Sequence, residues 1–144
     1  MSDALPVRPA RPDEAAAPGV RVSVFELAGG QAFFDALVDR FYRGVESDPG
    51  LLTIYPDHDD LDGARHRLAL FLGQYWGGPT TYSDERGHPR LFMRHKGFRI
   101  DPAARDRWLG HMREAVAFMD PPAVVSVALL RYFDMAAEAM RNTD

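Results

Sequence analysis

His95 is the side chain of this sequence best suited to binding a metal. It lies between Arg94 and Lys96, and a histidine imidazole is the commonest metal ligand among protein side chains. Apolar residues lie close to this basic run: Leu91, Phe92 and Phe98. A histidine in such surroundings is often only packed and hydrogen-bonded, so the local pattern leaves both interpretations open.

Aromatic side chains with polar tips fall on apolar faces of the chain: Tyr42, Tyr55, Tyr75 and Trp108. A buried tyrosine or tryptophan normally needs a hydrogen-bond partner for its O–H or N–H group. Several of them in one small chain therefore suggest a shared polar target inside the protein.

The other histidines are weaker candidates for a buried role. His111 follows Trp108 by three residues, at the margin of an apolar helix face, and competes with His95. Solvated cap, helix-surface and turn positions explain the rest: His58, His66 and His88. The motifs G-x-S-x-G, P-loop and H-E-x-x-H do not occur. The acidic run 57–60 lacks the spacing of a calcium-binding EF-hand, and helix capping explains it better.

Length and composition limit the class of protein. The 144 residues suffice for one domain with a single core or one sizeable ligand. A formal net charge of −4 gives no reason to expect nucleic acid or an anionic membrane as a partner. The absence of cysteine excludes disulfides and thiolate metal sites. No apolar run approaches the roughly 20 residues that span a bilayer, so a cytoplasmic protein is expected.

Helical periodicity runs through most of the chain. Apolar residues recur at spacings of three and four over these stretches: 34–45, 61–75, 105–119 and 125–140. Ser23 could cap a further short helix that ends at Gly29-Gly30. No stretch shows sustained period-two alternation, and the predicted fold is all-α.

The two remaining regions of the chain have a different composition. Residues 1–21 are rich in proline and alanine with few large apolar groups, which predicts a disordered tail before a domain over 22–144. The connection 77–90 begins Gly-Gly-Pro and is largely polar, which predicts a loop of about 14 residues. A plain helical bundle acting as an interaction module would not need so long a loop.

Several longer motifs follow one another along the chain. In order they are FY at 41–42, YP at 55–56, QYWGGP at 74–79, TYS at 81–83, RGHPRL at 86–91, MRH at 93–95, and Trp108 at the start of a helix. In this combination the sequence resembles the group II truncated haemoglobins over about residues 23–142.

This resemblance implies a truncated globin fold, a two-over-two helical sandwich around haem b, with His95 as the proximal ligand of the iron. Because the chain has no cysteine, the haem would be held non-covalently. The resemblance implies a distal ligand-binding set: Tyr42, Tyr55, Trp108, Ala64 and Leu68. It also implies haem contacts, with Arg67, Tyr82 and Arg94 at the propionates and Leu68, Phe71, Trp108 and Met112 elsewhere. A solvated helix face explains Arg67 almost as well.

The same resemblance implies binding of O₂, CO and NO at the iron. The Trp108 indole N–H and a tyrosine O–H are both expected to point at O₂, which becomes partly superoxide-like. Such donors would stabilise O₂ more than CO, by about 1.5–3 kcal/mol per hydrogen bond. We therefore expect slow O₂ release and redox use, such as nitric oxide dioxygenation or peroxidase-like chemistry with an external reductase, rather than transport. The alternative is a haem-free globin-like adaptor for protein partners. The sequence is compatible with a monomer or a homodimer.

Overall fold

The computed structural model describes residues 22–55, 61–87 and 100–142, and every regular element in these ranges is a helix. The helices are α2 (Val24–Ala28), α3 (Gln31–Glu46), α4 (Pro49–Leu52), α5 (Asp62–Tyr75), α6 (Thr81–Arg86), α8 (Pro102–Met119) and α9 (Ala123–Met140). The predicted all-α fold is confirmed. The predicted tail of residues 1–21 and the predicted ligand His95 lie outside the described residues.

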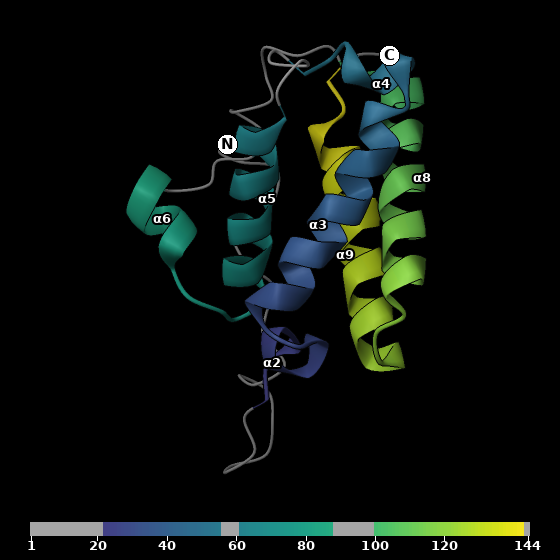
Figure 1. The fold of residues 1–144 in the computed structure, drawn as a ribbon. Helices are drawn as coiled ribbons and strands as arrows, with labels where there is room; N and C mark the ends of the chain where they lie inside the picture. The colour runs from purple at the N-terminus through teal and green to yellow at the C-terminus, as the bar shows by residue number, and fades with distance from the viewer. Residues whose placement is uncertain (1–21, 56–60, 88–99, 143–144) are drawn as a thin grey trace.

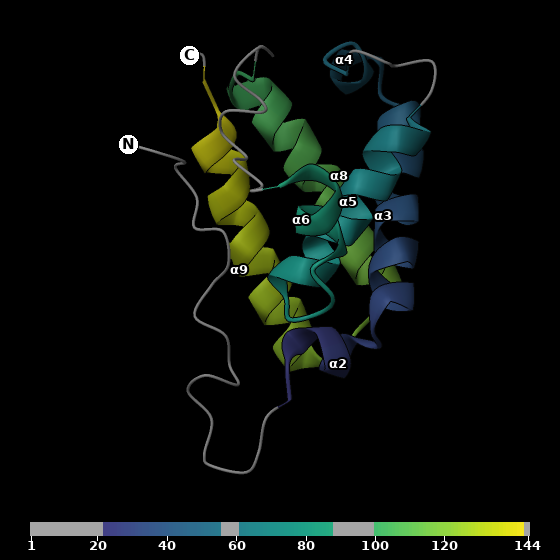
Figure 2. The same ribbon diagram turned by 90° about the vertical axis from the view of Figure 1, so that its left-hand side faces the viewer.

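The long helices form two pairs, α3 with α5 and α8 with α9. Helix α3 packs against α5 on one side and against α8 on the other, and α8 packs against α9 (Figure 1). The short helices lie at the edges of these pairs, with α2 at one end of the molecule, α4 at the other and α6 outside α5 (Figure 2). Helix α3 therefore lies at the centre, in contact with α5 of its own pair and with α8 of the other pair.

The predicted apolar stripes are the buried faces of the long helices. On α3 the predicted residues are all buried: Phe34, Leu37, Val38, Phe41, Tyr42 and Val45. On α8 and α9 the most buried residues include Met112, Val116, Val125, Leu129 and Phe133. Arg105, the first residue of the predicted 105–119 stripe, is only partly buried and forms an ion pair with Glu138 of α9.

Local capping fixes where several helices begin. Ser23 and Glu26 form a reciprocal capping box at the start of α2, as the sequence predicts for Ser23. Asp101 caps α8, whose first residue is Pro102. The predicted capping aspartates at 57–60 lie outside the described residues.

Helix α6 corrects the prediction of a continuous loop over 77–90. Residues Thr81–Arg86 are helical, and Tyr82 is their buried residue. The side chain of Gln74 anchors this helix to α5, accepting the Ser83 N–H at 2.9 Å and donating to the Ser83 hydroxyl at 2.7 Å. A six-residue helix with one buried side chain has no apolar stripe, so periodicity could not reveal it.

The end of α5 and the start of α2 are in close contact at Gly77. The backbone N–H of Phe25 donates to the carbonyl of Trp76 at 3.0 Å. Gly77 has a φ of 111°, and a Cβ at this position would lie 2.8 Å from the Cβ of Ser23. Both the backbone conformation and the space therefore require glycine.

No helix among the described residues is long and apolar enough to cross a membrane.

We predict that Gly77→Ala destabilises the protein more than Gly29→Ala. Gly29 has nearly the same φ, 118°, but a Cβ there would meet only Phe33, at an ordinary 3.7 Å. The Gly29 variant should lose about 1–2 kcal/mol for the left-handed backbone alone. The Gly77 variant should lose about 1–3 kcal/mol more for the overlap with Ser23. Urea unfolding measures both, and equal losses would contradict the role given to this contact.

Candidate functional site

Three of the four predicted polar aromatic residues come together at one point. Tyr42 is on α3, Tyr55 lies three residues after the end of α4, and Trp108 is on α8. The indole N–H of Trp108 donates to the Tyr55 hydroxyl, and the Tyr55 hydroxyl donates to that of Tyr42. The fourth, Tyr75, lies elsewhere, with its ring 4.2 Å from that of Tyr132 and 5.2 Å from that of Trp76.

The core fixes the two ends of this hydrogen-bond chain. Tyr42 is 3% exposed, and its ring lies 4.9 Å from that of Phe41. The Trp108 ring lies edge-on to Phe41 at 5.2 Å and to Phe133 at 5.8 Å. Aromatic contacts of this geometry add to the energy of burial, so Tyr42 and Trp108 are held on neighbouring faces of α3 and α8.

Burial keeps both phenols in their neutral, hydrogen-bond-donating form. It raises the pKa of Tyr42 to about 12, against the opposing effects of the hydrogen bond from Tyr55 and the charges of Arg67 and Arg65. Burial also raises the pKa of Tyr55 well above its ordinary value. Neither group is a phenolate near neutral pH. Within the hydrogen-bond chain, the O–H of Tyr55 donates to Tyr42. The O–H of Tyr42 itself is therefore free to donate to another group.

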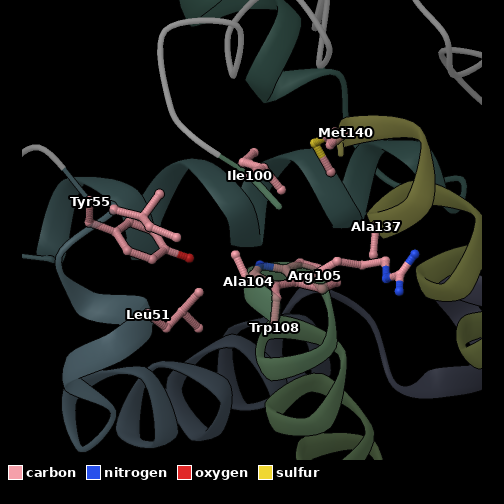
Figure 3. Close-up of a pocket in the computed structure, with 9 residues that line it drawn as sticks. Leu51, Tyr55, Ile100, Ala104, Arg105, Trp108, Ala137 and Met140 are labelled. Atoms are coloured by element: carbon pink, nitrogen blue, oxygen red, sulfur yellow. The ribbon is translucent and has the colours of Figure 1, made fainter. Parts of the chain in front are cut away.

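A hollow of about 70 Å³ lies beside the Tyr55–Trp108 contact. Its lining is mostly aliphatic and aromatic: Leu51, Ile54, Tyr55, Ile100, Ala104, Arg105, Trp108, Ala137 and Met140. The Tyr55 hydroxyl and the Trp108 indole nitrogen point toward one another at its edge (Figure 3). Its charged residue, Arg105, is paired with Asp106 and Glu138. The hollow therefore suits apolar or diatomic molecules and adjoins a line of polar donors.

The other predicted site residues on α5 and α6 lie in two places. Ala64 and Leu68 are partly buried on α5, whereas Phe71 is 4% exposed and its ring lies 5.6 Å from that of Tyr82. Arg67 is exposed, although its charge reaches the Tyr42 hydroxyl and lowers the pKa of that group. Met112 of α8 is fully buried. Arg94 and His95 lie outside the described residues.

Arg65 of α5 is a further neighbour of the site, and no pattern in the sequence indicated it. Its guanidinium lies 5.6 Å from the centre of the Tyr42 ring. It also forms ion pairs with Asp39 at 3.5 Å and with Glu46 at 3.2 Å on α3. A charged residue beside an apolar stripe gives no sequence signal for such a role, because its partners are on another helix.

Within the parts of the chain that the structure describes, no group of three or more His, Asp or Glu side chains is placed to hold a metal ion. The described residues therefore supply a donor chain and apolar walls, and no metal centre of their own.

Comparison with known proteins identifies relatives along most of the chain. Residues 23–142 match the family described as bacterial-like globin. Group 2 truncated hemoglobin YjbI of Bacillus subtilis (strain 168) is 35% identical over 78% of this chain and 84% of its own length.

Two solved structures have the same fold as this chain. A thermostable hemoglobin from the actinobacterium Thermobifida fusca is 51% identical, with a TM-score of 0.82 over 84% of this chain and 98% of that one. The truncated oxygen-avid haemoglobin of Bacillus subtilis is 34% identical, with a TM-score of 0.79 over 84% of this chain and 100% of that one. The two helical pairs are thus the two-over-two sandwich of a truncated globin, and the chain belongs to the bacterial-like globins and, among them, to the group 2 truncated haemoglobins.

Proposed function

We propose that this protein holds haem b non-covalently, with His95 as the proximal ligand, and binds O₂, CO and NO with slow release of O₂. Membership of the globin family implies haem and binding of diatomic ligands. The hydrogen-bond chain from Trp108 through Tyr55 to Tyr42 is the observation that supports the finer statement, because it ends in a Tyr42 O–H that the chain does not use. Its other two members line an apolar hollow.

The described residues fit a flat, largely apolar group with polar atoms at its rim. The partly buried Ala64 and Leu68 on α5 are available to contact its ring, together with Phe71. Arg67 is exposed and its charge reaches the site, as a partner for a propionate would require. Tyr82 and Arg94 complete the proposed propionate contacts. These assignments are extended from the family resemblance to the positions of this chain.

Haem, when bound, supplies an iron atom at which diatomic ligands bind reversibly. The chain itself supplies the selectivity among them. A hydrogen bond from Tyr42 O–H would stabilise polarised O₂ by about 1.5–3 kcal/mol, and would stabilise nearly neutral CO less. Trp108, which the sequence led us to expect as a direct donor to the ligand, instead acts with Tyr55 behind Tyr42, because its N–H donates to Tyr55 and each donation orients the next hydroxyl.

Tight retention of O₂ suits chemistry on O₂ better than its transport. We propose nitric oxide dioxygenation, in which O₂ and NO become nitrate with one electron from an external reductase, or peroxidase-like oxidation. The truncated haemoglobin of Bacillus subtilis with the same fold is described as oxygen-avid, which supports slow release here. Nitric oxide consumption measured with and without a chemical reductant tests the first of these reactions.

We predict that His95→Ala strongly reduces the Soret absorbance per protein chain, because the iron loses its protein ligand. His66→Ala is the matched control: His66 has a 60% exposed side chain on α5, 3.4 Å from Glu85, and its loss should leave the Soret band unchanged. An unaltered spectrum in the His95 variant would refute the proximal assignment. No Soret band in the natural protein after haem addition would favour the haem-free adaptor.

We predict that Tyr42→Phe raises the O₂ dissociation rate roughly 10- to 100-fold, which corresponds to one lost hydrogen bond to a polarised acceptor. The CO dissociation rate should change much less. Tyr75→Phe is the control. The Tyr75 hydroxyl is buried without a hydrogen-bond partner among the described residues, and it is not a member of the Trp108–Tyr55–Tyr42 hydrogen-bond chain. Stopped-flow displacement of O₂ by CO measures these rates. Similar O₂ rates in both variants would exclude Tyr42 as the donor.

A further inference from the structure

Asp48 joins α4 to α8 through both of its carboxylate oxygens. Oδ2 accepts from His111 Nε2 at 2.8 Å, and Oδ1 accepts from Arg107 Nη1 at 2.8 Å and from the backbone N–H of Leu51 at 3.3 Å. The side chain of Asp48 is only 11% exposed. The His111 hydrogen bond, together with the Arg107 charge, lowers the pKa of Asp48, so the carboxylate is ionised at neutral pH. We call Asp48, Arg107 and His111 the Asp48 clamp.

Two glycines leave room for the His111 and Arg107 side chains of the Asp48 clamp. A Cβ at Gly44 of α3 would overlap the His111 ring. A Cβ at Gly50 of α4 would lie 3.0 Å from Cζ of Arg107, which is closer than nine in ten real Cβ contacts. Larger residues at either position would push His111 or Arg107 away from Asp48. The close approach of these side chains is therefore built into the backbone on both sides.

One end of the Asp48 clamp leads directly to Tyr55. The backbone N–H of Leu52 donates to the carbonyl of Asp48 at 2.8 Å, and the N–H of Tyr55 donates to the carbonyl of Leu52 at 3.1 Å. Leu51, between them, is 3% exposed and lines the hollow beside Tyr55. A displacement of Asp48 would pass through this hydrogen-bonded turn to the Tyr55 ring.

The other end of the Asp48 clamp leads to Trp108. Arg107 precedes Trp108 in sequence and His111 lies one helical turn beyond Arg107, so the two donors to Asp48 lie on either side of Trp108 along α8. Trp108 of α8 and Tyr55, which follows α4, line the same hollow (Figure 3). The clamp is thus a direct polar link between the segments that bear the donor and the acceptor of the Trp108–Tyr55 hydrogen bond.

We propose that Asp48 is a positioning residue, which through Arg107 and His111 holds α4 against α8 and so sets the hydrogen bond from Trp108 to Tyr55. The effect on that hydrogen bond depends only on the structure. Its effect on O₂ release rests on the proposed function.

Asp48→Asn is the sharpest test, because asparagine caps a helix about as well as aspartate. It keeps an acceptor for the Leu51 N–H and removes the negative charge that Arg107 and His111 share. The matched control is Asp134→Asn. Asp134 pairs with Arg113 of α8 at 2.6 Å, but both side chains are more than half exposed and lie on the α9 side of α8.

The first measurement is hydrogen exchange of the tryptophan indole N–H groups, followed by NMR in the CO-saturated protein. Trp76 is the internal reference. Its indole N–H is buried, is not part of the Trp108–Tyr55–Tyr42 hydrogen-bond chain, and has no partner among the described residues. Asp48→Asn should speed exchange at Trp108 by roughly fivefold or more, and the O₂ dissociation rate by roughly three- to tenfold, as expected for partial loss of one hydrogen bond. Asp134→Asn should change neither rate.

A second variant, His111→Leu, removes the hydrogen bond from Nε2 to Asp48 at a half-buried position. It tests the proposal if Asp48→Asn does not fold. Unchanged exchange at Trp108 in the folded variants would overturn the proposal, and so would equal acceleration at Trp76 and Trp108, which would indicate general loosening. If the natural protein binds no O₂, the proposed function fails, while exchange at Trp108 in the haem-free protein still decides the role of Asp48.

Discussion

The hydrogen-bond chain from Trp108 through Tyr55 to Tyr42 is the interaction on which the site depends. Its members are polar groups in apolar surroundings, where an unpaired donor is costly, so each needs the next. Pairing along the chain uses the Trp108 N–H and the Tyr55 O–H and leaves the Tyr42 O–H for a ligand. Burial keeps both phenols neutral, so the chain can donate across the whole physiological range of pH.

The three members of the chain are positioned by different means. Tyr42 and Trp108 are on long helices whose faces pack through Phe41, and their separation is fixed by the core. Tyr55 follows the four-residue helix α4, which buries little by itself and is linked to α8 by the contacts of Asp48 with Arg107 and His111. The middle of the hydrogen-bond chain therefore depends on the polar contacts of Asp48, whereas its ends depend on apolar packing.

The sequence predicts those parts of the structure that leave a periodic pattern. The stripe over Phe34–Val45 identifies α3 and its buried face, and Ser23 marks the start of α2. The sequence also identifies three polar aromatic residues on apolar faces, Tyr42, Tyr55 and Trp108. It does not predict the order in which they donate hydrogen bonds to one another. The bonds from Asp48 to Arg107 and His111 join residues 59 and 63 positions apart and have no local signature. The sequence does not predict helix α6 for a related reason, because polar contacts between Gln74 and Ser83 hold it in place.

A double-mutant cycle on O₂ dissociation tests most directly whether the three residues act as one unit. Trp108→Phe alone should raise the O₂ dissociation rate several-fold, because Tyr55 loses its donor and Tyr42 its orientation. In a Tyr42→Phe background the same change should alter the rate by less than about twofold, since residues of one network do not act additively. The same several-fold factor in both backgrounds would show that Trp108 acts on the ligand independently, and would contradict the chain.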